Sequence, residues 1–198
     1  FGYYNKSSNI TNDLRATDIG DFIDTGYISS VVYDFKTDAV YIAGDNGIFA
    51  YYNKSSNTTM DLSATDNGNW IRDGYIASIA YDSKNDGVYL IGNSNVDSSK
   101  IIGYYNKSAN TTVDLRATII NDLIGTNVLT SIVYDSTKDG AYFSGYNGLL
   151  GYYSKAANRT VYLGDTDTGN WLGTSNLLAL SYDFGNDGVF QGGWFGSF

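Results

Sequence analysis

The chain has 198 residues, of which 42% are hydrophobic, and this is enough to form the core of one domain or one tandem array. Its formal net charge of −9, from 21 acidic and 12 basic residues, argues against nucleic acid as a partner, because affinity for phosphate backbones is built from Lys and Arg. The lack of Cys and His excludes disulfides, thiolate metal sites and imidazole chemistry, and no apolar run approaches the roughly 20 residues of a membrane span.

Two residue pairs recur along the chain at the same intervals. A Tyr-Tyr pair begins at positions 3, 51, 104 and 152, and a Tyr-Asp pair begins at positions 33, 81, 134 and 182. Both series have steps of 48, 53 and 48 residues, so the two markers share one insertion, which falls within Asn93–Lys100. The sequence therefore predicts four copies of a unit of about 48 residues.

Each unit has the pattern of four short strands. In the second unit, an alternating segment (76–81) leads through an Asn-Asp-Gly turn to 88–91, and 101–105 leads through a polar turn to 111–116. Since Pro is absent, Asn, Asp and Gly must supply the tight β connections. Four antiparallel strands in about 48 residues are typical of a β-propeller blade, which buries its faces only against neighbouring blades. The main alternative, a β-solenoid, normally has shorter periods and lacks paired hairpins.

Residues 1–4 and 194–198 occupy the same position within the unit. We therefore expect a single array over 1–198, with three whole blades at about 28–65, 76–118 and 128–166. A fourth blade is expected from 175–198 together with 1–18. Joining these parts within one chain would close a four-blade ring, and joining them between two chains would build a larger ring. Because both ends of the chain fall at the same position of the unit, the chain can also be a piece of a longer array.

Two stretches, 28–49 and 129–149, share a longer pattern. Each has a hydroxyl-rich strand, an Asp turn, a hydrophobic strand ending in Gly, and an Asn-Gly step before an apolar residue. This pattern resembles the repeats of two-component-regulator-type propellers, a periplasmic or extracellular sensor family, and the resemblance implies a propeller fold. Signalling is not carried over, because fold does not imply function and the usual Trp of the second strand is replaced. The replacing residues are Tyr41, Tyr89, Tyr142 and Phe190.

Acidic, amide and aromatic residues recur in the loop that joins one unit to the next. In a propeller this loop shares one face with the loop that carries the Asn93–Lys100 insertion. A ring for stacking and polar groups for orienting hydroxyls are typical of sugar binding. The alternative is a turn whose aromatic side chain fills the gap between blades, since the third copy has Leu123. The candidate ligand-binding residues are Phe22, Asp66, Asn69, Trp70, Asp167, Asn170 and Trp171.

In each unit an Asp follows the recurring Tyr of the Tyr-Asp pair, at positions 34, 82, 135 and 183. Repeated carboxylates are suited to Ca²⁺, but these lie one per blade and are expected to bond to the backbone of their own turns. No metal and no other cofactor are therefore predicted.

Seven Asn-X-Ser/Thr sequons cluster around the third turn of the unit, on the face opposite the candidate site. N-glycosylation of an exported protein is one interpretation, and the copying of one polar turn is the other. The sequons begin at Asn5, Asn9, Asn53, Asn57, Asn106, Asn110 and Asn158.

Motifs for catalysis are missing from the sequence. The carboxylate pair Asp165 and Asp167 lies in a turn without a partner base, as turn-forming acids commonly do, so no enzyme is predicted. The sequence predicts a non-catalytic scaffold, extracellular or at the cell surface, that binds a glycan or protein ligand on the loop face. The alternative is a self-assembling surface-layer or filament subunit whose terminal strands pair between chains.

Overall fold

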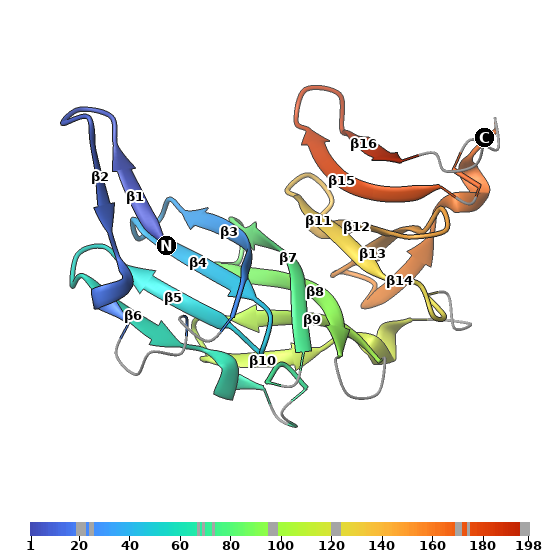
Figure 1. Ribbon diagram of the computed structural model, residues 1–198. Helices are drawn as coiled ribbons and strands as arrows, with labels where there is room; N and C mark the ends of the chain where they lie inside the picture. Colours follow the sequence, from blue (N-terminus) through green and yellow to red (C-terminus); the bar gives the residue numbers. More distant parts are fainter. Residues whose placement is uncertain are drawn as a thin grey trace.

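The computed structural model describes residues 1–18, 23, 26–66, 68, 70–72, 74–94, 99–119, 124–168, 172–173 and 175–194. Three four-stranded antiparallel sheets and two two-stranded hairpins follow one another along an arc (Figure 1). Within each sheet the strands are hydrogen-bonded in chain order, as in a propeller blade. The predicted all-β propeller fold is confirmed.

The strands have the following bounds. The first blade contains β3 (Ile28–Asp34), β4 (Ala39–Gly44), β5 (Phe49–Asn53) and β6 (Thr58–Asp61). The second contains β7 (Gly74–Asp82), β8 (Gly87–Ser94), β9 (Lys100–Asn106) and β10 (Thr111–Asp114). The third contains β11 (Leu129–Asp135), β12 (Gly140–Gly145), β13 (Leu150–Ser154) and β14 (Arg159–Tyr162). The hairpins are β1 (Gly2–Asn5) with β2 (Ile10–Asp13), and β15 (Asn176–Asp183) with β16 (Gly188–Trp194). Short 3₁₀ helices follow the outer strands at Arg15–Thr17, Ser63–Thr65, Arg116–Thr118 and Gly164–Thr166.

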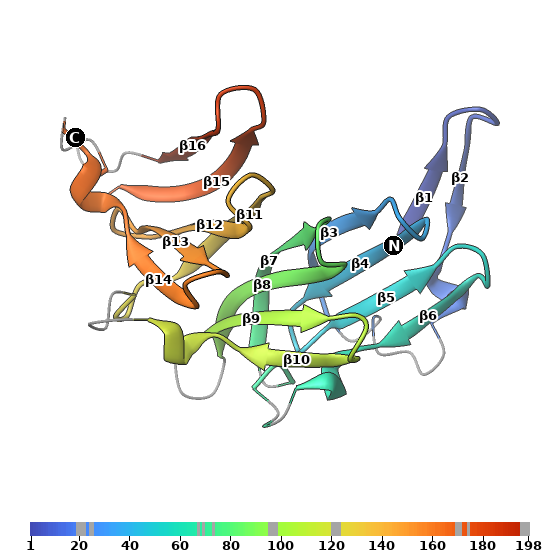
Figure 2. The same ribbon diagram turned by 180° about the vertical axis from the view of Figure 1, so that it is seen from behind.

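The first strands of successive blades, β3, β7, β11 and β15, lie side by side on the inner side of the arc (Figure 2). Serine hydroxyls link them: Ser30 Oγ accepts a hydrogen bond from the Ile79 amide at 3.2 Å, and Ser131 Oγ accepts one from the Leu180 amide at 3.1 Å. The amides of the inner strands therefore find partners in the preceding blade.

Tyrosines form the packing layer between blades. Tyr41 on β4 is fully buried, and its ring stacks on Tyr81 of the next blade at 6.3 Å and meets Tyr105 edge-on at 6.0 Å. One repeat later Tyr89 packs in the same way on Tyr134 and Tyr153, at 6.1 and 5.9 Å. Each such ring pair adds about 0.5–1.5 kcal/mol to the burial of apolar area. Adjacent blades are thus held together by a repeated aromatic contact.

The first and the third turn of each unit are held by the same pattern of hydrogen bonds. Asp34 Oδ1 accepts hydrogen bonds from the amides of Lys36 and Thr37 at 2.9 and 3.3 Å. The turn then closes at Asp38, whose φ of 51° is left-handed and whose carboxylate accepts the Tyr33 hydroxyl at 2.8 Å. The Asx turn expected for this aspartate is confirmed. In the third turn Asn takes the place of both Asp residues, as in Asn53 with Asn57 (φ 53°).

The two hairpins lie at opposite ends of the arc in both views (Figures 1 and 2). Hairpin β1–β2 packs on the first blade, where Phe1 meets Tyr52 at 6.0 Å and the Thr17 and Thr59 hydroxyls bond at 2.8 Å. β1 and β16 belong to separate two-stranded sheets. The expected fourth blade from 175–198 and 1–18 stays a prediction.

The buried hydroxyls of the aromatic layer provide a test of its energetics. Tyr89 Oη is buried without a hydrogen-bond partner among the described residues, and the equivalent residue of the fourth unit is Phe190. We expect Tyr89→Phe to leave the free energy of unfolding unchanged or to raise it by up to about 1 kcal/mol, because an unsatisfied buried hydroxyl is removed. Tyr81→Phe is expected to cost about 1.5–3 kcal/mol, because the Tyr81 hydroxyl donates to Asp86 at 2.8 Å.

Urea denaturation of both variants measures the difference. Equal losses of stability in the two variants would contradict the conclusion that the Tyr81 hydroxyl stabilises the fold and the Tyr89 hydroxyl does not.

Candidate binding surfaces

The predicted ligand-binding residues fall on loops of different blades. Asp66 and Trp70 follow β6 of the first blade, whereas Asp167 follows β14 of the third. Phe22, Asn69, Asn170 and Trp171 lie outside the described residues. The described members of the set therefore come from two different blades, and their role in ligand binding stays a prediction.

The carboxylates of these loops hold the loop backbone. Asp66 Oδ2 accepts a hydrogen bond from the Ile71 amide at 2.8 Å. The same bond joins Asp167 Oδ2 to the Leu172 amide at 2.6 Å. An acid that accepts an amide five residues later fixes the path of the chain into the next blade. This accounts for the recurrence of the acid without a ligand.

Trp70 is half-buried and packs against the core shared by the first two blades. Its indole lies over Gly103, where it leaves no room for a Cβ atom. The Arg116 guanidinium lies 5.9 Å from the ring centroid on the indole. These contacts favour the interpretation of Trp70 as a side chain that fills the gap between blades.

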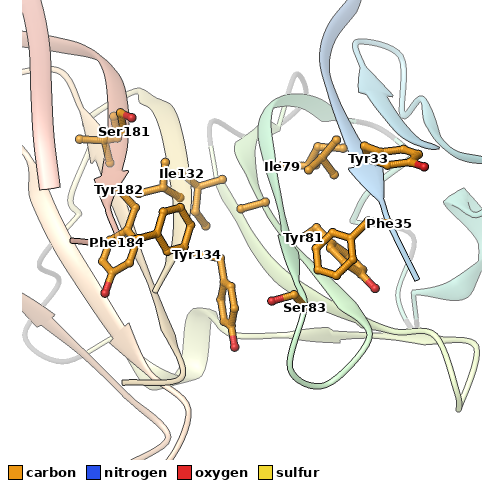
Figure 3. A pocket seen from close by; sticks show the side chains of 14 residues that line it. Tyr33, Phe35, Ile79, Tyr81, Ser83, Ile132, Tyr134, Ser181, Tyr182 and Phe184 are labelled. Atoms are coloured by element: carbon orange, nitrogen blue, oxygen red, sulfur yellow. The ribbon is translucent and has the colours of Figure 1, made fainter. Parts of the chain in front are cut away.

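A second surface, not foreseen from the sequence, is a groove of about 400 Å³ along the inner strands (Figure 3). Figure 3 shows Ile79 and Tyr81 on one side and Ile132 and Tyr182 on the other, from β7, β11 and β15. The lining is mainly apolar and aromatic. The groove exists because the inner strands of successive blades meet along one concave face.

Two phenylalanines lie at the rim of this groove. Phe35 is 63% exposed and meets Tyr81 edge-on at 5.6 Å. Phe184 is 75% exposed and meets Tyr182 at 4.9 Å. Each directly follows the Tyr-Asp pair of its unit, where the two middle units have Ser. This departure from the repeat was the signal in the sequence that could have identified the groove.

The buried aspartates beneath the groove are paired with lysines of the following blade. Asp34 Oδ2 lies 2.6 Å from Lys107 Nζ, and Asp82 Oδ2 lies 3.0 Å from Lys155 Nζ. Burial opposes ionisation of Asp34, but hydrogen bonds from Lys107 and Thr37 outweigh it and lower its pKa to about 2. A carboxylate held ionised in this way acts as a structural acceptor rather than as a general acid.

The described residues contain no helix long and apolar enough to cross a membrane, and no group of three or more acidic side chains in them could hold a metal ion.

Comparison with known proteins extends only to the fold. No protein-family model matches the chain, and no curated protein matches it, so the resemblance to regulator-type repeats gains no support from a family model. Among solved structures the chain is similar to the one described as the structure of U3-55K, with 12% identity and a TM-score of 0.55. It is equally similar to the crystal structure of RRP9 WD40 repeats, with 11% identity and a TM-score of 0.55.

Both matches cover 78% of this chain and 42% of the solved chain, so the present chain spans less than half the length of either. At this identity the likeness shows a β-propeller fold.

The Asp34–Lys107 pair makes stability depend on pH. The pKa of Asp34 in the folded chain, about 2, lies below its ordinary value of 3.8, so the unfolded chain binds the proton first as the pH falls. The stabilisation is fully present above about pH 4 and is lost as the pH falls to about 2. Asp34→Asn is expected to be less stable at pH 7 and to lose less stability than the wild type between pH 4 and pH 2. Thermal unfolding midpoints across this range provide the measurement, and equal losses in both proteins would refute the linkage.

Proposed function

We propose that the chain is a non-catalytic propeller scaffold outside the cell that binds a protein partner in the groove of its inner strands. The observation that carries this proposal is the exposure of Phe35 and Phe184 at the rim of an apolar groove. Aromatic side chains are enriched in protein–protein interfaces, and exposed apolar patches commonly mark them.

The groove favours a protein segment over a glycan. A sugar site needs free polar groups to orient hydroxyls, whereas the nearest carboxylates are engaged: Asp34 and Asp82 by lysines, and Asp86 by the Tyr81 hydroxyl. On the loop face, Trp70 is half-buried beneath Arg116. Glycan binding through Asp66, Trp70 and Asp167 is therefore the secondary form of the proposal.

The non-catalytic role is supported by the state of the acidic residues. Asp34 and Asp82 accept hydrogen bonds from lysines, and Asp66 accepts a backbone amide of its own loop. The propeller likeness agrees with a scaffold by analogy of fold only. Nothing that the similar proteins bind is transferred to this chain.

An extracellular location is supported by the sequons. Asn9, Asn57, Asn110 and Asn158 are all exposed, and each side-chain oxygen accepts a tyrosine hydroxyl, as Asn57 does from Tyr52 at 3.0 Å. The remaining sequon residues, Asn5, Asn53 and Asn106, are partly exposed in the same turns. The resemblance to an exported sensor family points in the same direction.

Selection from a displayed peptide library tests the groove. Apolar and aromatic peptides are expected to be enriched, and Phe35→Ala is expected to weaken their binding at least tenfold because the rim contact is lost. The matched control is Met60→Ala, an exposed apolar side chain on the outer strand β6. A failure to enrich any peptide, or equal binding to wild type and Phe35→Ala, would overturn the proposal. Binding on a glycan array that Trp70→Ala abolishes would support the loop face instead.

Mass spectrometry of the protein isolated from its own source tests the location. Hexose-containing additions are expected at Asn57 and its equivalents, because these residues are exposed. Unmodified asparagines at all seven sequons would remove this support for export.

A further inference from the structure

The hairpins at the two ends of the arc correspond to complementary halves of the repeating unit. β15 and β16 correspond to the first and second strands of a unit, and β1 and β2 to the third and fourth. In the first blade Val40 pairs with Tyr52, and Tyr41 pairs with Tyr51. Carried over by the repeat, this register pairs Val189 with Tyr4 and Phe190 with Tyr3. Among the described residues β16 pairs only with β15, so its other edge is open there to a strand in the position of β1.

The N-terminal end of the arc holds a vacant place for Phe190. Inside the array, Tyr41 packs among four aromatic rings at centroid distances between 5.0 and 6.5 Å: Phe49, Tyr51, Tyr81 and Tyr105. The residues at the equivalent positions one unit earlier are Phe1, Tyr3, Tyr33 and Tyr52. All four line a cavity of about 400 Å³. Phe190, which stands where Tyr41 does in its unit, is 68% exposed.

A buried carboxylate at the other end lacks its lysine. Asp135 is fully buried, and both its Oδ2 and the hydroxyl of Tyr152 are without a hydrogen-bond partner among the described residues. One unit earlier Lys155 Nζ bonds to both equivalents, Asp82 Oδ2 and Tyr104 Oη, each at 3.0 Å. The Oδ1 atom of Asp135 already accepts the Tyr182 hydroxyl at 2.8 Å. A buried polar atom without a partner is costly, so Oδ2 is suited to a lysine from the next blade.

The repeat identifies that lysine as Lys6. The lysines that bond Asp34 and Asp82 come from the third turn of the following blade, and for Asp135 that turn is the one between β1 and β2. Lys54 is the corresponding lysine in the third turn of the first blade, at the other end of the arc. It lies 5.1 Å from the Tyr3 ring, as Lys107 lies 5.0 Å from Tyr51, and its equivalent acid is Asp183.

We propose that a second copy of this chain supplies the missing halves. In each joint, β1–β2 of one copy pairs with β16 of the other, Phe190 fills the aromatic cavity, and Lys6 reaches Asp135. Within one chain the hairpin is already seated before the first blade, and it lies at the opposite end of the arc from β16 (Figures 1 and 2). The chain matches 42% of the length of each of the two solved propeller chains. This fits an arc that forms only part of a ring.

Two chains with four blade positions each make a ring of eight, at the upper end of the propeller range of roughly 4–8 blades. The two joints are then related by twofold symmetry, which closes the assembly. This inference concerns the terminal edges and does not rest on the proposed function of the groove.

Light scattering of the 198-residue chain tests the assembly. A mass of twice 21.6 kDa is expected for the wild type. Phe190→Ala is expected to raise the dissociation constant at least tenfold, and Lys6→Met is expected to weaken the dimer as well. The matched controls are Met60→Ala, an exposed apolar side chain on the outer strand β6, and Lys36→Met in an exposed turn. Because Phe190 is exposed in the single chain, its loss is not expected to unfold the monomer, and thermal melting checks this.

Cross-linking decides which copy completes the blade. The chain has no Cys, so Val189→Cys combined with Tyr4→Cys introduces a single pair of thiols at the joint. A covalent dimer on oxidation is expected. A bond within one chain at monomer mass would overturn the proposal in favour of a ring closed by one copy, and a ladder of polymers would overturn it in favour of an open filament. A monomeric wild type without any cross-link would also overturn it.

Discussion

The packing of one blade against the next is the interaction on which the rest of this structure depends. The aromatic residue of the second strand shows this directly, because an equivalent ring occurs in every unit but faces a different neighbour in each. Tyr41 and Tyr89 each face a complete blade and are buried, whereas Tyr142 faces only a two-stranded hairpin and is half-buried. Phe190 faces no blade in its own chain and is exposed. Burial is therefore supplied by the neighbour and not by the unit itself.

The polar groups depend on the same neighbour. Aspartates are fully buried at the ends of β3, β7 and β11, where the following blade can supply a lysine. Asp34 receives Lys107 and Asp82 receives Lys155. Burial opposes ionisation of Asp34, but the bond from Lys107 and the bond from the Thr37 hydroxyl together lower its pKa. Asp135 has the turn without the lysine. The Asp135 oxygen without a partner and the exposed Phe190 ring are independent observations. Both indicate that the contact beyond hairpin β15–β16 is not completed by the described residues.

The sequence could predict what is decided within one unit. Alternation and the Tyr-Asp pair indicated the strands, and the Asx turn of Asp34 followed from the short reach of an aspartate side chain. The curvature of the arc could not be read in this way, because it depends on small angles between blades that no residue pattern specifies. The groove was missed because its walls come from residues a whole unit apart, and Phe35 alone resembles an ordinary turn residue. The bond between Asp66 and the Ile71 amide could not be predicted either, because it depends on how the loop folds.

Near-identical units leave few places for specialised function, so the departures from the repeat carry the most information. Phe35 and Phe184 stand where the middle units have Ser. Phe35 packs on Tyr81, the inner-strand tyrosine of the next blade. By the same relation, Phe184 would meet Tyr33 of a second copy, whose ring is exposed within one chain. Assembly would then complete the aromatic wall of the groove at each joint, because both features are built on the inner strands. The surface that binds a partner and the contact that closes the ring would share one tyrosine layer.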